Sequence, residues 1–182
     1  MGGFQLWVNM PAKLKLSRPR YQEVVDASIP VVEQPDGTRV RVVAGRCDGT
    51  QGPVTEIYAD PEYLDVELVA GADFVQPIPR GHAAFAYVFR GEGEFGAASD
   101  LGYRGDLDGS LVQAPSLVVF DDGDQVRVRA YESPLRFLLV SGAPLGEPVA
   151  RYGPFVMNTR EEIEQALDDL RADTFIWSED RA

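Results

Sequence analysis

The segment "YVFRGEGEFG", residues 87–96, contains the spacing Gly-x-Gly-x-x-Gly that begins at Gly91 and is typical of dinucleotide-binding loops. Such a loop binds pyrophosphate only where it leaves a strand and opens a helix, because the phosphates need the unpaired N–H groups of a helix N-terminus. The residues that follow have no helical apolar spacing. Before the glycines, Phe85, Tyr87 and Phe89 alternate with other apolar residues. The segment therefore predicts a β-hairpin rather than a nucleotide-binding loop.

His82 is the sole histidine of the chain, and Cys47 is the sole cysteine. A metal site built from several imidazoles cannot be assembled from one histidine. Ser–His or Cys–His catalysis would have to use His82, and a lone cysteine is more often a packed apolar residue than a nucleophile. The acidic turn "DDGD", residues 121–124, lacks the ligand spacing of a calcium loop. We therefore predict no catalytic residue and no metal ligand.

Composition narrows the possible partners. The 182 residues are 45% apolar, and 29 acidic against 17 basic residues give a net charge of -12. This charge repels nucleic acids and anionic lipids, so we expect a protein partner or a small ligand instead, with no direct nucleic-acid or membrane binding. The single cysteine and the lack of a signal peptide or a long apolar run predict a soluble intracellular protein, cytoplasmic or nuclear.

Short alternating apolar runs separated by Gly, Pro and Asp turns predict a mainly β protein. Residues 29–33 and 39–44 flank the turn "QPDGT", which predicts a hairpin. Leu64, Val66 and Leu68 alternate with residues predicted to face solvent, whereas residues 135–140 read as a fully buried strand. About ten such runs without intervening helices favour a sandwich or barrel.

One helix is predicted near the C-terminus. Thr159 and Glu162 have the Thr-x-x-Glu spacing of a capping box, in which each side chain bonds a free N–H group at the helix start. Apolar residues then recur every three or four positions and define one face of the helix. That face comprises Ile163, Ala166, Leu167 and Leu170.

Three segments together resemble the pirin family, whose members are double cupin barrels. They are "GGFQLWVNMPAKLK", "YLDVELVAGADFVQPIPRGHAAFAYVFRGEGEFG" and "EPVARYGPFVMNTREEIEQALDDLR". The resemblance covers the C-terminal two-thirds of pirins and implies an all-β, cupin-type double-stranded β-helix, a jelly-roll-like antiparallel barrel, with a C-terminal α-helix. It divides the chain into a junction segment (1–20), a metal-free barrel (21–150) and a capping helix with a tail (151–182).

In pirins the N-terminal barrel holds iron through three histidines and a glutamate, and that barrel precedes the segment matched by "GGFQLW". The resemblance therefore carries over no iron ligand, and we expect no cofactor in this chain. Counting back from "YVFRG", the equivalent positions of the second barrel are Pro77, Pro79 and Ala83, which cannot bind a metal, and His82 lies one step out of register. The stretch 97–115, with Tyr103, Arg104 and Leu111, departs from the family as a longer loop.

The family includes iron-dependent quercetinases and nuclear transcription cofactors that bind other proteins, and this implies two hypotheses. The first is a metal-free protein-binding or scaffold module, transcription-cofactor-like. The second is a fragment or half of an iron-dependent dioxygenase of the quercetin 2,3-dioxygenase type. In the first hypothesis a partner or a second copy contacts Leu6, Trp7 and Val8 and the helix face with Ile163, Leu167 and Leu170.

A small aromatic ligand inside the barrel is a third hypothesis. We expect the aromatic residues of the strand before Gly91 to point inward, toward residues of later strands. Core packing explains the same residues and is favoured. The candidate residues are Phe85, Tyr87, Phe89, Val128 and Phe137.

Overall fold

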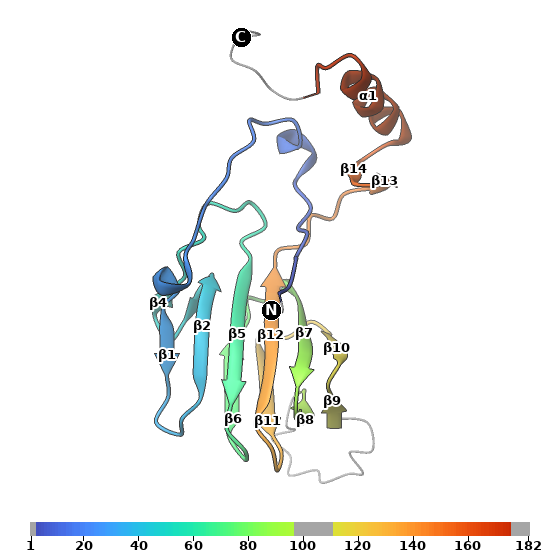
Figure 1. Ribbon diagram of the computed structural model, residues 1–182. Coiled ribbons are helices and arrows are strands. Elements are labelled where there is room, and N and C mark those ends of the chain that lie inside the picture. The colour runs from blue at the N-terminus through green and yellow to red at the C-terminus, as the bar shows by residue number, and fades with distance from the viewer. Residues whose placement is uncertain (1–2, 97–110, 176–182) are drawn as a thin grey trace. The chain divides into compact units, whose positions relative to one another are not determined.

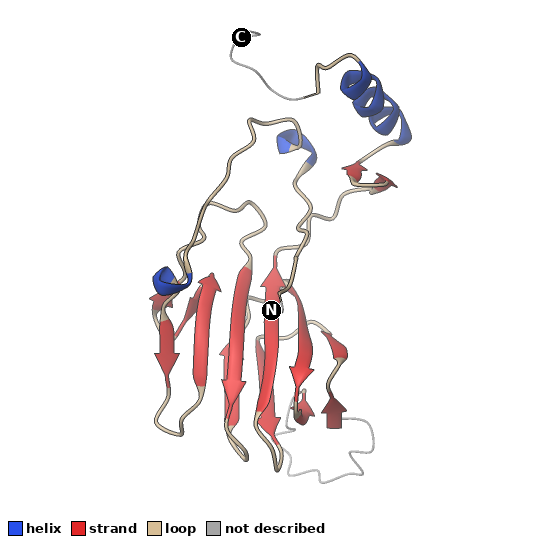
Figure 2. Cartoon of the chain, viewed as in Figure 1, coloured by secondary structure: helices blue, strands red, loops and turns tan. Residues whose placement is uncertain are grey.

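The computed structural model describes residues 3–96 and 111–175 (Figure 1). Contacts divide the chain into two compact units: Glu23–Pro144 is one, and the described residues of Met1–Gln22 form the other together with those of Leu145–Ala182. The described residues of the expected junction segment and of the expected C-terminal segment lie in the same unit. Figure 2 shows that strands dominate the larger unit. No helix among the described residues is long and apolar enough to cross a membrane.

The larger unit is an all-β cupin barrel made from two main sheets (Figure 1). In the six-stranded sheet every pair is antiparallel, and the order is β1 (Val31–Glu33), β2 (Arg39–Ala44), β5 (Glu62–Leu68), β12 (Leu135–Gly142), β7 (Ala83–Arg90) and β10 (Ser116–Phe120). The second sheet has the order β6 (Asp73–Pro77), β11 (Gln125–Ala130), β8 (Glu92–Phe95) and β9 (Leu111–Gln113). The short pair β3 (Arg46–Cys47) and β4 (Thr50–Gln51) and the 3₁₀ turn η2 (Asp26–Ser28) complete the described elements of this unit.

The core lies between the two sheets, and it is filled by the alternate residues of each strand. Leu64, Val66 and Leu68 of β5 are fully buried, as the alternation predicts. Phe137 of β12 is also fully buried, and its ring meets those of Phe74 and Phe95 edge to face at 6.2 and 5.2 Å between centroids. Burying one such aromatic side chain contributes about 1.5–3 kcal/mol.

The predicted hairpin over residues 29–44 is confirmed, because β1 and β2 pair directly. The turn has the conformation that its residue types favour. Gly37 has a φ of 93°, which a residue without Cβ adopts readily, and the Asp36 side chain accepts a hydrogen bond of 2.9 Å from the N–H of Thr38. The turn therefore fixes the register of the first two strands.

The predicted hairpin at Gly91 is wrong. The residues after Gly91 do form a strand, but β7 pairs with β12 and β10, whereas β8 pairs with β11 and β9 of the other sheet. Gly91 has a φ of 78°, and a Cβ placed on it would lie 2.1 Å from the carbonyl oxygen of Pro134. The glycine therefore lets the chain pass close to another backbone where it crosses between sheets.

The predicted direction of the β7 aromatic residues is also wrong. Phe85, Tyr87 and Phe89 are half-buried on the outer face, and the Arg136 guanidinium lies 5.4 Å from the centre of the Phe89 ring. The inward positions of β7 hold smaller residues, which leave room for the large side chains opposite. These inward residues are Ala84, Ala86 and Val88. Both faces of β7 are apolar, so the alternation alone could not show which face turns inward.

Val128 and Phe137 do point inward, and both are fully buried in the core cluster. The five residues predicted to line an aromatic pocket therefore do not share one face, because these two point into the core while the three aromatic residues of β7 lie on the outer face. Leu111, placed by the sequence in a long loop, belongs to β9 and pairs with Glu94. Tyr103 and Arg104 lie outside the described residues.

The smaller unit contains the predicted helix, α1 (Arg160–Arg171), together with the strand pair β13 (Ala150–Tyr152) and β14 (Phe155–Met157) and the 3₁₀ turn η1 (Ala12–Leu14). The capping box is confirmed, since Thr159 accepts from the N–H of Glu162 and the Glu162 carboxylate accepts from the N–H of Thr159. The N–H of Ala12 donates to Glu147, and the Lys15 ammonium donates to the carbonyl of Val156. Segments from both ends of the sequence thus form this unit.

Candidate functional site

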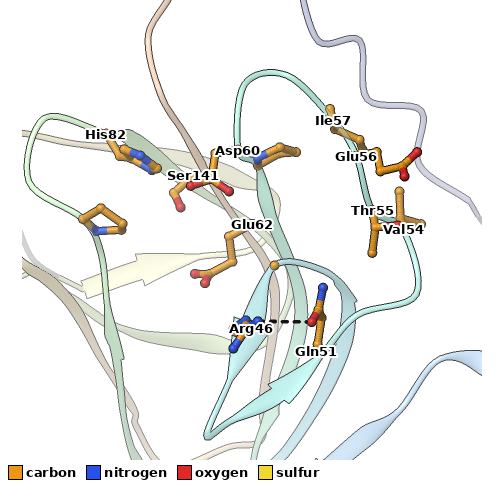
Figure 3. A pocket seen from close by; sticks show the side chains of 13 residues that line it. Arg46, Gln51, Val54, Thr55, Glu56, Ile57, Asp60, Glu62, His82 and Ser141 are labelled. Atoms are coloured by element: carbon orange, nitrogen blue, oxygen red, sulfur yellow. Dashed lines mark hydrogen bonds between the residues drawn. The ribbon is translucent and has the colours of Figure 1, made fainter.

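A pocket of about 400 Å³ lies within the barrel unit (Figure 3). Its walls come from the β3–β4 pair, the segment leading into β5, the connection between β6 and β7, and the end of β12. A volume of this size suits a small organic molecule. The lining residues are Gly45, Arg46, Gln51, Val54, Thr55, Glu56, Ile57, Asp60, Pro61, Glu62, Pro79, His82 and Ser141.

Two polar residues lie side by side on one wall of this pocket. Glu62 begins β5 and faces the same side of the strand as Leu64, which is in the core. Ser141 lies near the end of β12 directly opposite Glu62 in the strand register. Cross-strand partners have Cβ atoms about 4.5–5.5 Å apart. At the pocket, the inward-facing apolar series of β5 and β12 is therefore followed by the carboxyl of Glu62 and the hydroxyl of Ser141.

Gln76 of β6 orients the carboxyl. Its amide N–H donates to Oε2 of Glu62 and to the carbonyl oxygen of Arg46, each at 3.0 Å, and its side chain is buried. Gly45 permits the close approach of this wall, because a Cβ there would lie 2.9 Å from the Cα of Glu62. The buried amide of Gln76 thus fixes the position of the Glu62 carboxyl, and Gly45 leaves space for the backbone of Glu62.

The pKa of Glu62 is raised to about 7, chiefly by burial and in smaller part by the charge of Asp60, against the hydrogen bonds from Gln76 and from the Arg46 backbone, which lower it. This carboxyl therefore changes its charge near neutral pH. Burial also raises the pKa of the neighbouring Cys47 thiol to about 12. Cys47 is in the core, which confirms its interpretation as a packed residue.

Oε1 of Glu62 and Oγ of Ser141 are buried, and neither has a hydrogen-bond partner within the described part of the chain. A buried polar atom without a partner costs about 1–3 kcal/mol. Both residues line the same pocket, so N–H or O–H groups of a bound ligand are the kind of partner that these two atoms lack. The arrangement is suited to binding, with one carboxyl whose charge depends on pH.

Sequence reasoning missed these three polar residues, although a signal was present. Gln76 lies between the apolar residues Phe74 and Ile78 at the period of a strand, and all three face inward. Glu62 and Ser141 extend the inward series of β5 and β12 in the same way. A polar side chain at a position that alternation assigns to the core indicates a buried polar site.

Pro77, Pro79 and Ala83, the positions matched to the iron ligands of the family, are exposed, and Pro79 lines the pocket. None of these three side chains has a donor atom. The inward residues beside Pro77 and Ala83 are Gln76, Ile78 and Ala84. Ile78 and Ala84 have no donor atom in their side chains, and an amide is a poor substitute for a histidine.

The donors of the pocket do not fit an iron site of three histidines and a glutamate. His82 lines the pocket but is the sole imidazole of the sequence, and the surroundings of Glu62 favour its neutral form. Across residues 3–96 and 111–175, no group of three or more His, Cys, Asp or Glu side chains is arranged to hold a metal ion.

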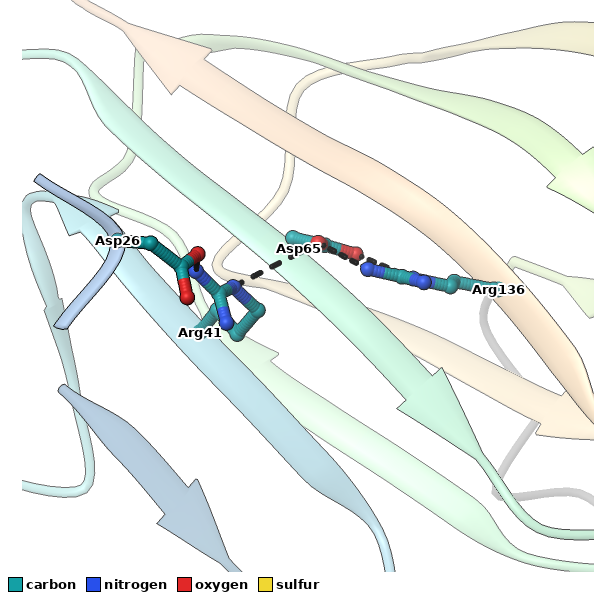
Figure 4. A network of polar contacts seen from close by, with 4 residues as sticks. All are labelled: Asp26, Arg41, Asp65 and Arg136. Atoms are coloured by element: carbon teal, nitrogen blue, oxygen red, sulfur yellow. Dashed lines mark hydrogen bonds and ion pairs between the residues drawn. The ribbon is translucent and has the colours of Figure 1, made fainter. Parts of the chain in front are cut away.

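A charged network lies on the outer face of the six-stranded sheet (Figure 4). Asp65 accepts two hydrogen bonds from Arg136, at 2.9 and 2.6 Å, and Arg41 lies 4.0 Å from the same carboxylate while also contacting Asp26. The residues come from three neighbouring strands and from η2. The network links neighbouring strands, and its place on the outer face separates it from the pocket.

Comparison with known proteins gives a family match to the pirin C-terminal cupin domain over residues 63–176. The chain is 40% identical to Pirin-1 of Arabidopsis thaliana over 171 residues, which are 93% of this chain and 56% of that protein. It is 43% identical to a pirin-like protein of Caulobacter vibrioides over 176 residues, which are 96% of this chain and 59% of that protein. The chain thus spans little more than half the length of these relatives.

Among solved structures, quercetin 2,3-dioxygenase from Acinetobacter baumannii superposes with a TM-score of 0.79 at 28% identity. The superposition covers 93% of this chain and 55% of that protein. A second similar structure is GK1651 from Geobacillus kaustophilus, with a TM-score of 0.66 at 28% identity over 79% of this chain and 54% of that one. These similarities agree with the cupin fold derived above.

Proposed function

Because the chain belongs to the pirin family and contains its C-terminal cupin domain, we propose that it is a metal-free cupin module that acts by binding another protein. The pocket supports the absence of a metal, because it contains one imidazole, that of His82, and its surroundings favour the neutral form of Glu62. The net charge of -12 supports a protein partner over nucleic acid.

The observation that carries the binding role is an apolar face at one edge of the six-stranded sheet. Leu117 and Val119 of β10 are 61% and 73% exposed, and β10 is the last strand of that sheet. They pair in register with Tyr87 and Phe85 of β7, whose half-buried rings extend the same face. Clustered exposed apolar residues mark interaction sites.

We propose a second partner surface on the smaller unit. Leu6, Trp7 and Val8 are exposed. The predicted helix surface is smaller than expected, because Ile163 is buried and Leu167 packs against it in a cluster with Met157, Ala166 and Phe155. Leu170 is the exposed member of the predicted helix contact.

The test combines elemental analysis with mass in solution. We expect purified chain to hold far less than one iron per molecule, and to run as a dimer or to retain a partner protein. The double variant Leu117→Ser, Val119→Ser should lose that association while keeping a native circular dichroism spectrum. Stoichiometric iron would refute the metal-free half. Unchanged association of the variant would refute the assignment of the β10 face.

A second candidate is the metal-free half of a quercetinase-type dioxygenase, which the superposition on the Acinetobacter enzyme favours. In that case the chain contributes structure to a site on another barrel, and by itself it has no turnover. The measurement is loss of quercetin absorbance in air with added ferrous iron. Turnover by the isolated chain would contradict both candidates.

A further inference from the structure

The pocket presents two adjacent hydrogen-bond acceptors that the fold leaves unused. Ser141 is 3% exposed, its Oγ has no partner among the described residues, and it faces Glu62 across the β5–β12 pair. Gln76 donates to Oε2 of Glu62, and Oε1 has no partner within residues 3–96 and 111–175.

The charges around Glu62 favour a cation there. Asp60 and Glu56 line the same pocket, and His82 and Arg46 are the basic groups that do so. The Arg46 guanidinium donates to the side-chain oxygen of Gln51 at 3.2 Å, and this contact directs it along the β3–β4 pair (Figure 3). A buried carboxylate is stabilised most by a charged donor at hydrogen-bond distance.

We propose that this pocket binds a small organic ammonium ion, with Glu62 as its counter-ion and Ser141 as a second acceptor. An ammonium group carries two or three N–H donors and no acceptor, which matches two unpaired oxygens. The pocket volume of about 400 Å³ accommodates the organic part. This inference is separate from the protein-binding role and rests on the barrel unit alone.

Binding of a cation requires the charged form of Glu62, so affinity should rise with pH. With a pKa of about 7, the ionised fraction grows roughly tenfold between pH 6 and pH 8. The thiol of Cys47, with its pKa raised to about 12, stays neutral over this range. The other charged or titratable residues that line the pocket are Asp60, Glu56, His82 and Arg46.

The experiment uses benzylamine and benzyl alcohol, which share a ring and differ in charge. Each is titrated into the full ¹⁵N-labelled chain at pH 6 and pH 8, and amide shifts are followed by NMR. We expect benzylamine to shift the amides of Gly45, Gln51 and Ser141, with a Kd about tenfold lower at pH 8 than at pH 6. Benzyl alcohol should bind more weakly, with one Kd at both pH values.

Variants identify the groups responsible. Glu62→Gln should abolish the pH dependence and weaken benzylamine binding at pH 8 by at least tenfold, and Ser141→Ala should weaken it several-fold while keeping the pH dependence. Glu67→Gln, on the outer face of the same strand, should leave the Kd unchanged. The dispersion of each amide spectrum reports whether the variant is folded.

Three results would overturn the proposal. One is the absence of shifts at the pocket amides with benzylamine in the tens of millimolar at pH 8. Another is equal affinity for benzyl alcohol and benzylamine, which would make this a site for neutral ligands. The third is a pH dependence that survives in folded Glu62→Gln.

Discussion

Replacing Glu62 with Gln should make the protein more stable at pH 8 and leave its stability unchanged near pH 4. In the folded chain the pKa of this carboxyl is raised from 4.5 to about 7, mainly by burial. Between these values the folded state holds more protons than the unfolded state, so the free energy of unfolding falls as pH rises. Gln has no proton to lose and keeps a side chain that can bond Gln76.

The full shift corresponds to about 3 kcal/mol. Water reaches part of this side chain and screens the charge, so about 1–2 kcal/mol is the expected gain for the variant at pH 8. The loss in wild-type protein begins above pH 4.5 and is complete above pH 7. The difference between variant and wild type isolates Glu62 from the general effect of the acidic surface.

The assay is urea unfolding followed by circular dichroism at several pH values from 4 to 8. Glu67→Gln serves as the matched control, because Glu67 lies on the same strand but faces outward. The control should not share the gain in stability at pH 8, because Glu67 is not on the core face of the strand. If the stability of Glu62→Gln parallels that of wild type across this range, the carboxyl is not shifted and the reasoning fails.

Two further predictions concern the backbone. Gly91→Ala should destabilise the barrel by more than about 2 kcal/mol in the same unfolding assay, because the new Cβ would clash with the Pro134 carbonyl and the residue has a positive φ. Gly71 has a similar φ but open space around it. Gly71→Ala should therefore cost only about 1–2 kcal/mol. Equal losses in the two variants would exclude the clash as the cause. Thr159→Ala should remove the hydrogen bond to the Glu162 N–H and cost about 1 kcal/mol of stability in the smaller unit, measured by hydrogen exchange of the α1 amides. Unchanged exchange would show that this cap does not stabilise the helix.

Period-two alternation in the sequence identified most of the barrel. Leu64, Val66 and Leu68 are buried as predicted, since polar residues separate them and only one face can enter the core. The same rule gave the wrong face for Phe85 and Tyr87, because both faces of β7 are apolar. Which face of β7 turns inward then depends on the volume of the side chains packed opposite it, and those side chains belong to residues distant in sequence.

The site was less accessible to sequence reasoning than the fold. Glu62, Gln76 and Ser141 come from three strands, and no local motif connects them. Their chemistry arises when β5 and β12 pair in one register and β6 places its amide opposite. A carboxyl that is ordinary in the unfolded chain then loses its water, and its pKa rises.

The sequence by itself determined the family, the β architecture, the capped helix and the shortage of imidazoles, because these follow from local patterns and counts. The tertiary structure decided which sheet each strand joins, that segments from both ends of the chain belong to one unit, and that buried oxygens of Glu62 and Ser141 have no partner among the residues it describes. Those features depend on contacts between residues far apart in the chain, whose geometry no local pattern contains.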